Sequence, residues 1–131
     1  MDLLKMFNTT KNDKRTILAV DDQPDILDTL KKFLKLEYNV YCMTTAEAAL
    51  KFLKTRTPDL ILLDIEMPDM NGIELLEILR DMDKLKNVPI VFLTGNSGMD
   101  NLQEVALGGA DGFIQKPVDF KFVKRIEKYI K

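Results

Sequence analysis

The amino-acid sequence predicts an α/β fold, a (βα)5 doubly wound five-stranded parallel sheet with helices on both faces, which makes a three-layer sandwich. Five short runs of aliphatic and β-branched residues recur along the chain, and their first residues lie 21 to 29 positions apart. That spacing suits strand–helix repeats and is too long for hairpins. The chain has 131 residues, 46% of them hydrophobic, which is enough for one buried core.

The predicted strands are residues 16–20, 39–43, 60–63, 89–93 and 112–115. The third strand and residues 90–93 of the fourth are apolar at every position. Such runs are typical of strands that are buried on both faces, as in a parallel sheet between two helical layers. Right-handed crossovers between the strands then give an open, doubly wound sheet.

Helical periodicity fills the segments between these strands. Pro24 stands where a first-turn proline is tolerated, ahead of an apolar stripe at helical spacing. Thr44 with Glu47 predicts a capping box for the second helix, and Asn71 precedes the third. These signals place one helix after each of the first three strands.

The last two helices have weaker signals. Ser97 is expected to cap the fourth helix, and Asp119 is expected to cap the fifth. In the fifth helix, Phe120, Val123, Ile126 and Ile130 are expected to face the core. The residues before the first strand, 1–15, lie outside the repeat. We expect them to form a flexible extension, with a short amphipathic helix as the alternative, and residues 16–131 to form the domain.

Composition excludes several kinds of chemistry. The chain has no histidine and a single cysteine, Cys42. This rules out an internal disulfide, a cysteine zinc site, histidine-dependent triads, histidine-ligated metals and a phosphohistidine carrier. The 19 basic and 21 acidic residues give a net charge of −2, which does not favour direct nucleic-acid binding. Because no apolar run is long enough to span a membrane and the first residues lack a signal-peptide core, we expect a cytoplasmic protein without a membrane partner.

Polar side chains collect where the predicted strands end. Asp21 and Asp22 follow the first strand, Asp64 follows the third, Thr94 ends the fourth and Lys116 follows the fifth. In a doubly wound sheet the carboxyl ends of the strands form the ligand-binding edge. The sequence therefore predicts that these five side chains meet in one site.

The chemistry of such a cluster requires a cation. Two carboxylates about 4 Å apart repel by roughly 4 kcal/mol at an effective dielectric constant near 20. Lys116 offsets one of three negative charges, so a divalent ion with oxygen ligands, Mg²⁺ or alternatively Mn²⁺, is expected at the site. A carboxylate beside such an ion can attack phosphorus and form an aspartyl phosphate.

The segments that carry these residues, DD at 21–22, LILLDIEMPDMNG at 60–72, FLTG at 92–95 and GADGFIQKP at 109–117, resemble the receiver domain of bacterial response regulators. The resemblance spans residues 16–131 in order and spacing. It implies a flavodoxin-like fold, like that of single-domain chemotaxis receivers.

The resemblance also assigns roles to individual residues. It implies that Asp64 is the phosphoacceptor and that Asp21, Asp22, Asp64 and the backbone carbonyl of Glu66 bind Mg²⁺. It identifies Thr94 and Phe113 as coupled switch residues and Lys116 as the lysine that contacts phosphate. The remaining residues shape the site: Pro68, Gly72, Gly95, and Pro117, which is expected to follow a cis peptide bond.

Some of these residues have simpler interpretations. Phe113 is equally typical of a strand aromatic that packs in the core. Glu66, two residues after Asp64, is expected to influence the lifetime of the phosphorylated state, and Gly95 is expected to leave the rim open to small phosphodonors. Taken alone, Asp64 fits a turn residue after a buried strand as well as it fits a functional residue, and the joint placement of the five side chains favours the site.

The resemblance implies a phosphorylation-controlled signalling switch. A histidine kinase or a histidine phosphotransfer protein would supply the phosphoryl group, docking near the first helix and the loop after the fifth strand. A downstream protein would bind the face made by the fourth helix, fifth strand and fifth helix. The protein would modify itself without turnover, as a monomer or as a phosphorylation-induced dimer.

Three alternatives remain at this point. We expect a stand-alone receiver, because the chain as given leaves no residues for an output domain. The first alternative is a receiver module from a multidomain regulator or hybrid kinase. An aspartate-nucleophile phosphatase of the haloacid dehalogenase type also uses Asp, Thr and Lys, but its nucleophile follows the first strand. A flavin carrier would need a phosphate loop after the first strand, where Asp21 and Asp22 would repel phosphate.

Overall fold

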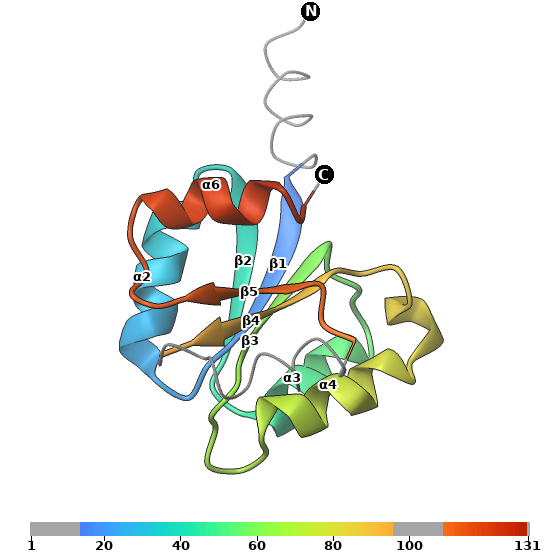
Figure 1. Ribbon diagram of the computed structural model, residues 1–131. Helices are drawn as coiled ribbons and strands as arrows, with labels where there is room; N and C mark the ends of the chain where they lie inside the picture. The colour runs from blue at the N-terminus through green and yellow to red at the C-terminus, as the bar shows by residue number, and fades with distance from the viewer. Residues whose placement is uncertain (1–13, 96–108, 131) are drawn as a thin grey trace, which may run out of the picture.

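The computed structural model describes residues 14–95 and 109–130, and it has a five-stranded parallel sheet at its centre (Figure 1). The strand order is β2-β1-β3-β4-β5, and each neighbouring pair is parallel. The strands are β1 (Arg15–Val20), β2 (Tyr38–Met43), β3 (Leu60–Asp64), β4 (Ile90–Thr94) and β5 (Gly112–Gln115). This confirms the predicted doubly wound sheet, since β1 has β2 on one side and β3 on the other.

Four α-helices and one short 3-10 helix are present in the described residues: α2 (Pro24–Leu34), α3 (Ala46–Leu53), α4 (Gly72–Arg80), η1 (Asp83–Leu85) and α6 (Lys121–Glu127). Figure 1 shows α2 and α6 on one face of the sheet and α3 and α4 on the other. The three-layer sandwich is therefore confirmed. The helix predicted after Ser97 lies outside the described residues, as do residues 1–13.

Two apolar clusters, one on each face of the sheet, form the core. One joins α2 and α6 to the sheet and the other joins α3 and α4 to it. Every residue of β3 and of β4 is buried, as their continuous apolar sequences predicted. Because Asp64 pairs with Leu93 in the register of β3 and β4, the polar residues that end these strands lie at the same edge. Within the described residues, no helix is both long enough and apolar enough to cross a bilayer.

The start of α3 differs from the predicted capping box. The N-cap is Thr45, not Thr44, and the Thr45 hydroxyl accepts a hydrogen bond from the Ala48 N–H at 3.0 Å. The capping box would require the helix to begin one residue earlier, with Glu47 in its third position. Instead the helix begins at Ala46, whose N–H donates to the carboxylate of Asp69, a distant residue.

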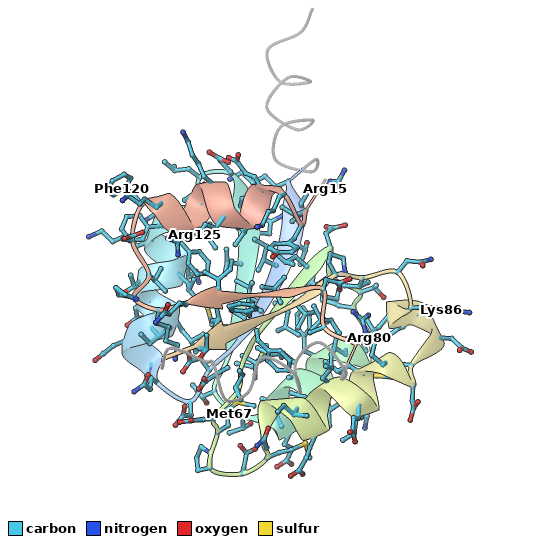
Figure 2. All side chains as sticks on the ribbon, in the orientation of Figure 1. Arg15, Met67, Arg80, Lys86, Phe120 and Arg125 are labelled. Atoms are coloured by element: carbon cyan, nitrogen blue, oxygen red, sulfur yellow. The ribbon has the colours of Figure 1, made fainter. Side chains whose placement is uncertain are left out.

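The start of α6 also differs from the prediction. Phe120 is 71% exposed, whereas Phe122 is 1% exposed and packs in the core with Ile126 and Ile130. Asp119 accepts hydrogen bonds from two first-turn amides, yet the residue directly before the helix is Phe120. The inward face is therefore set by Phe122 and Ile126, four residues apart, and Phe120 points outward (Figure 2).

Candidate functional site

The five predicted side chains meet at the carboxyl edge of the sheet. Asp21 and Asp22 directly follow β1, Asp64 ends β3, Thr94 ends β4 and Lys116 follows β5. The Lys116 N–H donates to the Thr94 carbonyl at 2.8 Å, which extends the pairing of β5 with β4 by one residue. The strand order thus brings together residues that are up to 95 positions apart in the sequence.

A pocket of about 310 Å³ opens at this edge. Its lining comes from the ends of β1, β3, β4 and β5 and from the residues that directly follow them. The lining residues are Asp22, Gln23, Asp64, Ile65, Glu66, Thr94, Gly95 and Lys116. Most of the lining side chains are polar or charged. The pocket is therefore suited to a small anionic group held by a cation and by polar donors.

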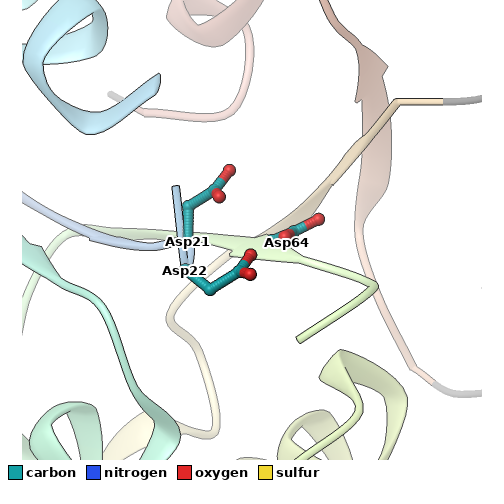
Figure 3. Close-up of side chains that lie close together, drawn as sticks. All are labelled: Asp21, Asp22 and Asp64. Atoms are coloured by element: carbon teal, nitrogen blue, oxygen red, sulfur yellow. The ribbon is translucent and has the colours of Figure 1, made fainter. Parts of the chain in front are cut away.

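Three carboxylates face one another in the pocket region (Figure 3). One oxygen from each of Asp21, Asp22 and Asp64 lies within 4.8 Å of the other two. Asp21 is fully buried, Asp64 is nearly so, and Asp22 is partly exposed. Because burial weakens the screening of charge, mutual repulsion of these groups is stronger here than on an open surface.

Lys116 is the cation paired with the carboxylates in the described part of the chain. Its Nζ lies 2.8 Å from Asp21 Oδ2 and 3.6 Å from Asp64 Oδ1. Asp21 Oδ1 also accepts a hydrogen bond from the Gln23 N–H at 2.9 Å. One ammonium group therefore faces three carboxylates and lies closest to the most deeply buried one.

The pKa of Asp64 reflects this shortage of positive charge. Burial, together with the charge of Asp21, raises the pKa of Asp64 from 3.8 to about 7. Lys116 and the hydrogen bond from the Glu66 N–H to Asp64 Oδ1, 3.3 Å long, act in the opposite direction. Without a further cation, the protonated form of Asp64 is thus populated near neutral pH.

The loop after β3 is fixed closely against the site. The Gly72 N–H donates to the Ile65 carbonyl at 2.8 Å, and a Cβ at position 72 would collide with the Asp64 carbonyl oxygen. Position 72 therefore requires glycine, because the backbone at Asp64 and Ile65 lies too close to leave room for a side chain. Pro68 is exposed in the same loop, and the side chain of Glu66 is exposed at the pocket.

The residues after β4 and within β5 complete the predicted set. Thr94 is buried at the pocket, while Gly95 has open space where a side chain would lie. The Lys116–Pro117 peptide bond is cis, as predicted. Phe113 is 42% exposed on β5, which is the edge strand of the described sheet, so its interpretation as a fully packed core residue is wrong.

Sequence reasoning missed two residues of this region. Gln23 lines the pocket and its backbone holds Asp21, although a glutamine before a helix carries no special signal. Asp69 lies in the loop after β3 and binds the first amide of α3, 23 residues earlier in the chain. A contact between segments this far apart leaves no local pattern in the sequence.

The donor set fits a magnesium ion. Asp21 Oδ2 is buried and accepts no hydrogen bond from any residue that the structure describes, although the Lys116 ammonium is beside it. Oxygen ligands from Asp21, Asp22 and Asp64 match the preference of a hard divalent cation. Such an ion would also relieve the repulsion that raises the pKa of Asp64.

The family model of the response regulator receiver domain matches residues 17–127 of the chain. Chemotaxis response regulator CheY4 of Vibrio cholerae has a similar structure, with a TM-score of 0.84 and 28% identity over 89% of this chain and 99% of that one. Response regulator TrrA of Thermotoga maritima, solved in complex with Mg²⁺ and BeF, has a TM-score of 0.77 and 31% identity over 88% and 99% of the two chains.

Similarity also extends to segments of longer proteins. Histidine kinase P4 of Formosa agariphila is 35% identical over 112 residues, which are 86% of this chain and 8% of that protein. The chain spans less than half the length of the first three curated relatives that it matches, at 8%, 28% and 46%.

Proposed function

The chain belongs to the response regulator receiver family, whose members are phosphoryl-accepting switches in phosphorelay signalling, and from this premise we propose that Asp64 is its phosphoacceptor. The observation that carries the proposal is the cluster of three carboxylates facing a single ammonium group at the pocket. Asp64 and Asp22 both line the pocket, and Asp64 is the one of these two that forms an ion pair with Lys116, at 3.6 Å.

The transfer forms a bond between a carboxylate oxygen of Asp64 and phosphorus as the bond from phosphorus to the donor histidine nitrogen breaks. The electron pair of the broken bond stays on the imidazole. Asp64 must be ionised to attack, and Lys116 Nζ, 3.6 Å from Asp64 Oδ1, favours the ionised form. Lys116 and the Thr94 hydroxyl are then placed to stabilise charge on the phosphoryl oxygens.

Asp21, Asp22, Asp64 and the backbone carbonyl of Glu66 would hold Mg²⁺ at this edge. When bound, the ion supplies positive charge that offsets both the carboxylates and the transferring phosphoryl group. The similar regulator TrrA was solved with Mg²⁺ and BeF, which supports the same ion here. Mn²⁺ has the same ligand preference and would substitute for it.

In this proposal the phosphoryl group comes from a histidine kinase or a histidine phosphotransfer protein, and the chain has no histidine that could carry it. The curated relatives include a histidine kinase that contains a similar segment, which is consistent with this kind of partner. We assign docking of the phosphodonor to α2 and to the loop between β5 and α6, at the rim of the pocket. Phe120 projects from that loop and is available to a partner.

Phosphorylation is transmitted through Thr94 and Phe113. Thr94 is buried at the pocket and pairs in register with Gln115, two residues along β5 from Phe113. We assign the output to a downstream protein that binds β5, α6 and the fourth predicted helix, which lies outside the described residues. In the described part of this face, α6 and its C-cap residue carry an exposed row of cations at helical spacing: Lys121, Lys124, Arg125 and Lys128.

The experiment that tests the proposal is labelling by acetyl phosphate, followed by intact-mass measurement. We expect uptake of one phosphoryl group by the wild-type chain in Mg²⁺, and none after EDTA treatment or in Asp64→Asn. Thr55→Ala, at an exposed position away from the pocket, serves as the control substitution. Labelling of Asp64→Asn to the wild-type level would contradict the proposal.

Glu66 sets the lifetime of the phosphorylated state in this proposal. Its exposed side chain lies at the pocket, two residues after Asp64, where it can reach a water that approaches the phosphoryl group. We expect Glu66→Ala to change the rate of autodephosphorylation, measured by loss of the labelled mass over time. Equal rates in Glu66→Ala and wild type would remove this role.

Beyond this site, we propose an N-terminal extension and a single domain that works in the cytoplasm. The predicted boundary between residues 1–15 and 16–131 moves by one residue, because Arg15 is the first residue of β1. The chain acts alone or as the receiver module of a longer regulator, as a monomer or a phosphorylation-induced dimer. It modifies itself and does not turn over a substrate. Continuous hydrolysis of p-nitrophenyl phosphate by the purified chain would favour the aspartate-nucleophile phosphatase instead.

A further inference from the structure

The loop that joins β3 to α4, residues 65–71, controls part of the pocket. Ile65 and Glu66 at its start line the pocket, and the Glu66 N–H holds Asp64 Oδ1. That hydrogen bond is 3.3 Å long, near the upper limit for an N–H donor, so a small shift of the loop is enough to break it. The position of the loop backbone therefore decides how Asp64 and Glu66 face each other.

Both ends of this loop are held by the backbone and the core. The Ile65 N–H donates to the Leu93 carbonyl at 3.3 Å, and the Gly72 N–H donates to the Ile65 carbonyl. Met67 is 8% exposed and packs in the cluster under α3 and α4. These contacts fix where the loop leaves the sheet and where it enters α4, but they do not hold its exposed middle.

Among the described residues, the hydrogen bond between the exposed middle of the loop and α3 comes from one side chain, and the neighbouring Met70 is partly buried against the apolar cluster that contains Met67. Pro68 and Asp69 are exposed, and Asp69 Oδ2 accepts a hydrogen bond from the Ala46 N–H at 3.1 Å. Ala46 is the first residue of α3 and is almost completely buried. A carboxylate at a helix N-terminus also gains from the helix dipole. Asp69 thus connects the loop to a firmly packed element on the same face of the sheet.

We propose that Asp69 is a positioning residue that holds the loop so that Asp64 and Glu66 are arranged for metal binding and phosphoryl transfer. This inference rests on the proposed function, since it assigns Asp69 a role in that same site. Asp69 neither lines the pocket nor belongs to the carboxylate cluster, so it acts through the loop.

The test compares two ways of weakening the start of α3. Asp69→Ala removes the acceptor of the Ala46 N–H and with it the tether of the loop. Thr45→Ala is the matched control, because it removes the acceptor of the Ala48 N–H in the same turn and leaves the loop untouched. Asp69→Asn keeps an oxygen acceptor but removes the charge.

Mg²⁺ affinity, measured by titrating backbone amide NMR signals with Mg²⁺ alone, is the primary readout, and the rate of labelling by acetyl phosphate is the second. We expect Asp69→Ala to raise the dissociation constant for Mg²⁺ about three- to tenfold. A tenfold rise corresponds to about 1.4 kcal/mol of binding free energy. Thr45→Ala is expected to stay within about twofold of wild type even where it lowers the unfolding midpoint. Asp69→Asn is expected to restore most of the affinity.

Each alternative role gives a different pattern. Equal Mg²⁺ affinity in Asp69→Ala and wild type would overturn the inference, as would equal losses in Asp69→Ala and Thr45→Ala, which indicate a purely structural cap. Asp69→Asn binding as weakly as Asp69→Ala would overturn it too, because only the charge of Asp69 would then matter. A wild-type chain that bound no Mg²⁺ would overturn the proposed function together with this inference. If the wild-type chain binds Mg²⁺ and only the result expected for Asp69→Ala is not seen, the inference fails and the proposed function stands.

Discussion

Charged side chains cluster at both ends of the sheet, but the two clusters differ in how far each charge is balanced by a partner. At the end where β4 and β5 begin, Arg80 donates to the carbonyls of Gly109, Leu85 and Val88 and to the carboxylate of Asp111, over 2.7 to 3.1 Å (Figure 2). Asp111 also accepts from the Ile90 N–H. At the carboxyl end, Lys116 faces three carboxylates, one of which has a buried oxygen with no hydrogen bond from the described residues.

This difference separates a structural cluster from a functional one. The Arg80 cluster ties the end of α4 to the segments before β4 and β5, and each nitrogen of the guanidinium group has a partner. The carboxylate cluster keeps an excess of negative charge in a buried place, which costs stability and prepares the site for a cation and a phosphoryl group. Loss of charge should therefore weaken the first end and stabilise the second.

The largest expected effect is at the compensated end. Arg80→Ala removes four hydrogen bonds from a half-buried guanidinium group, so we expect it to lower the free energy of unfolding by about 2–4 kcal/mol. Urea unfolding monitored by circular dichroism measures the change. Arg80→Lys, which retains the charge but not the planar group, should lose an intermediate amount. A loss below about 0.5 kcal/mol in Arg80→Ala would remove the contrast between the two ends.

An Asp→Asn substitution at each end of the sheet should change the free energy of unfolding in opposite directions. Without divalent metal, Asp64→Asn relieves the repulsion from Asp21 and is expected to raise the free energy of unfolding at pH 8 by about 1–3 kcal/mol. Asp111→Asn breaks the ion pair with Arg80 and is expected to lower it by about 0.5–1.5 kcal/mol. Urea unfolding in EDTA compares the two variants with wild type. Destabilisation by both substitutions would contradict this difference.

The gain from Asp64→Asn should depend on pH in a definite direction. The pKa of Asp64 is raised from 3.8 to about 7, so the folded chain retains a proton that the unfolded chain releases in this range. The contribution of the Asp64 proton to the free energy of unfolding is fully present below pH 3.8 and is lost as the pH rises through 7. The stability difference between Asp64→Asn and wild type should therefore widen between pH 5 and pH 8. A constant difference over that interval would show that Asp64 ionises as in the unfolded chain.

Mg²⁺ should have a small effect on stability, and only at the carboxyl end. At an ion concentration about ten times the dissociation constant, we expect the wild-type chain to gain about 1.4 kcal/mol in free energy of unfolding. Asp64→Asn should gain much less, because it loses a charged ligand, whereas Arg80→Ala should gain as much as wild type. Thermal unfolding with and without Mg²⁺ measures this, with Ca²⁺ as the comparison ion. An equal gain in Asp64→Asn would place the ion elsewhere.

Much of the fold could be predicted because its signals are local. The apolar runs of β3 and β4 fixed their burial, and helical stripes placed a helix after each of the first three strands. The site residues could also be located, since each follows a strand and parallel strands end at one edge. The Asp69 contact at the start of α3 and the inward face of α6 could not be predicted, because they depend on packing and on hydrogen bonds with distant elements.

The sequence by itself determined which side chains meet at the carboxyl edge, because the order of strands and helices fixes that edge. Only the tertiary structure decided how those side chains share charge: Lys116 lies nearer to Asp21 than to Asp64, and the pKa of Asp64 rises. It also decided that Phe113 is exposed and that Asp69 ties the β3–α4 loop to α3. The physical reason is that pair distances and burial depend on how the layers pack, and packing joins residues that no sequence pattern relates.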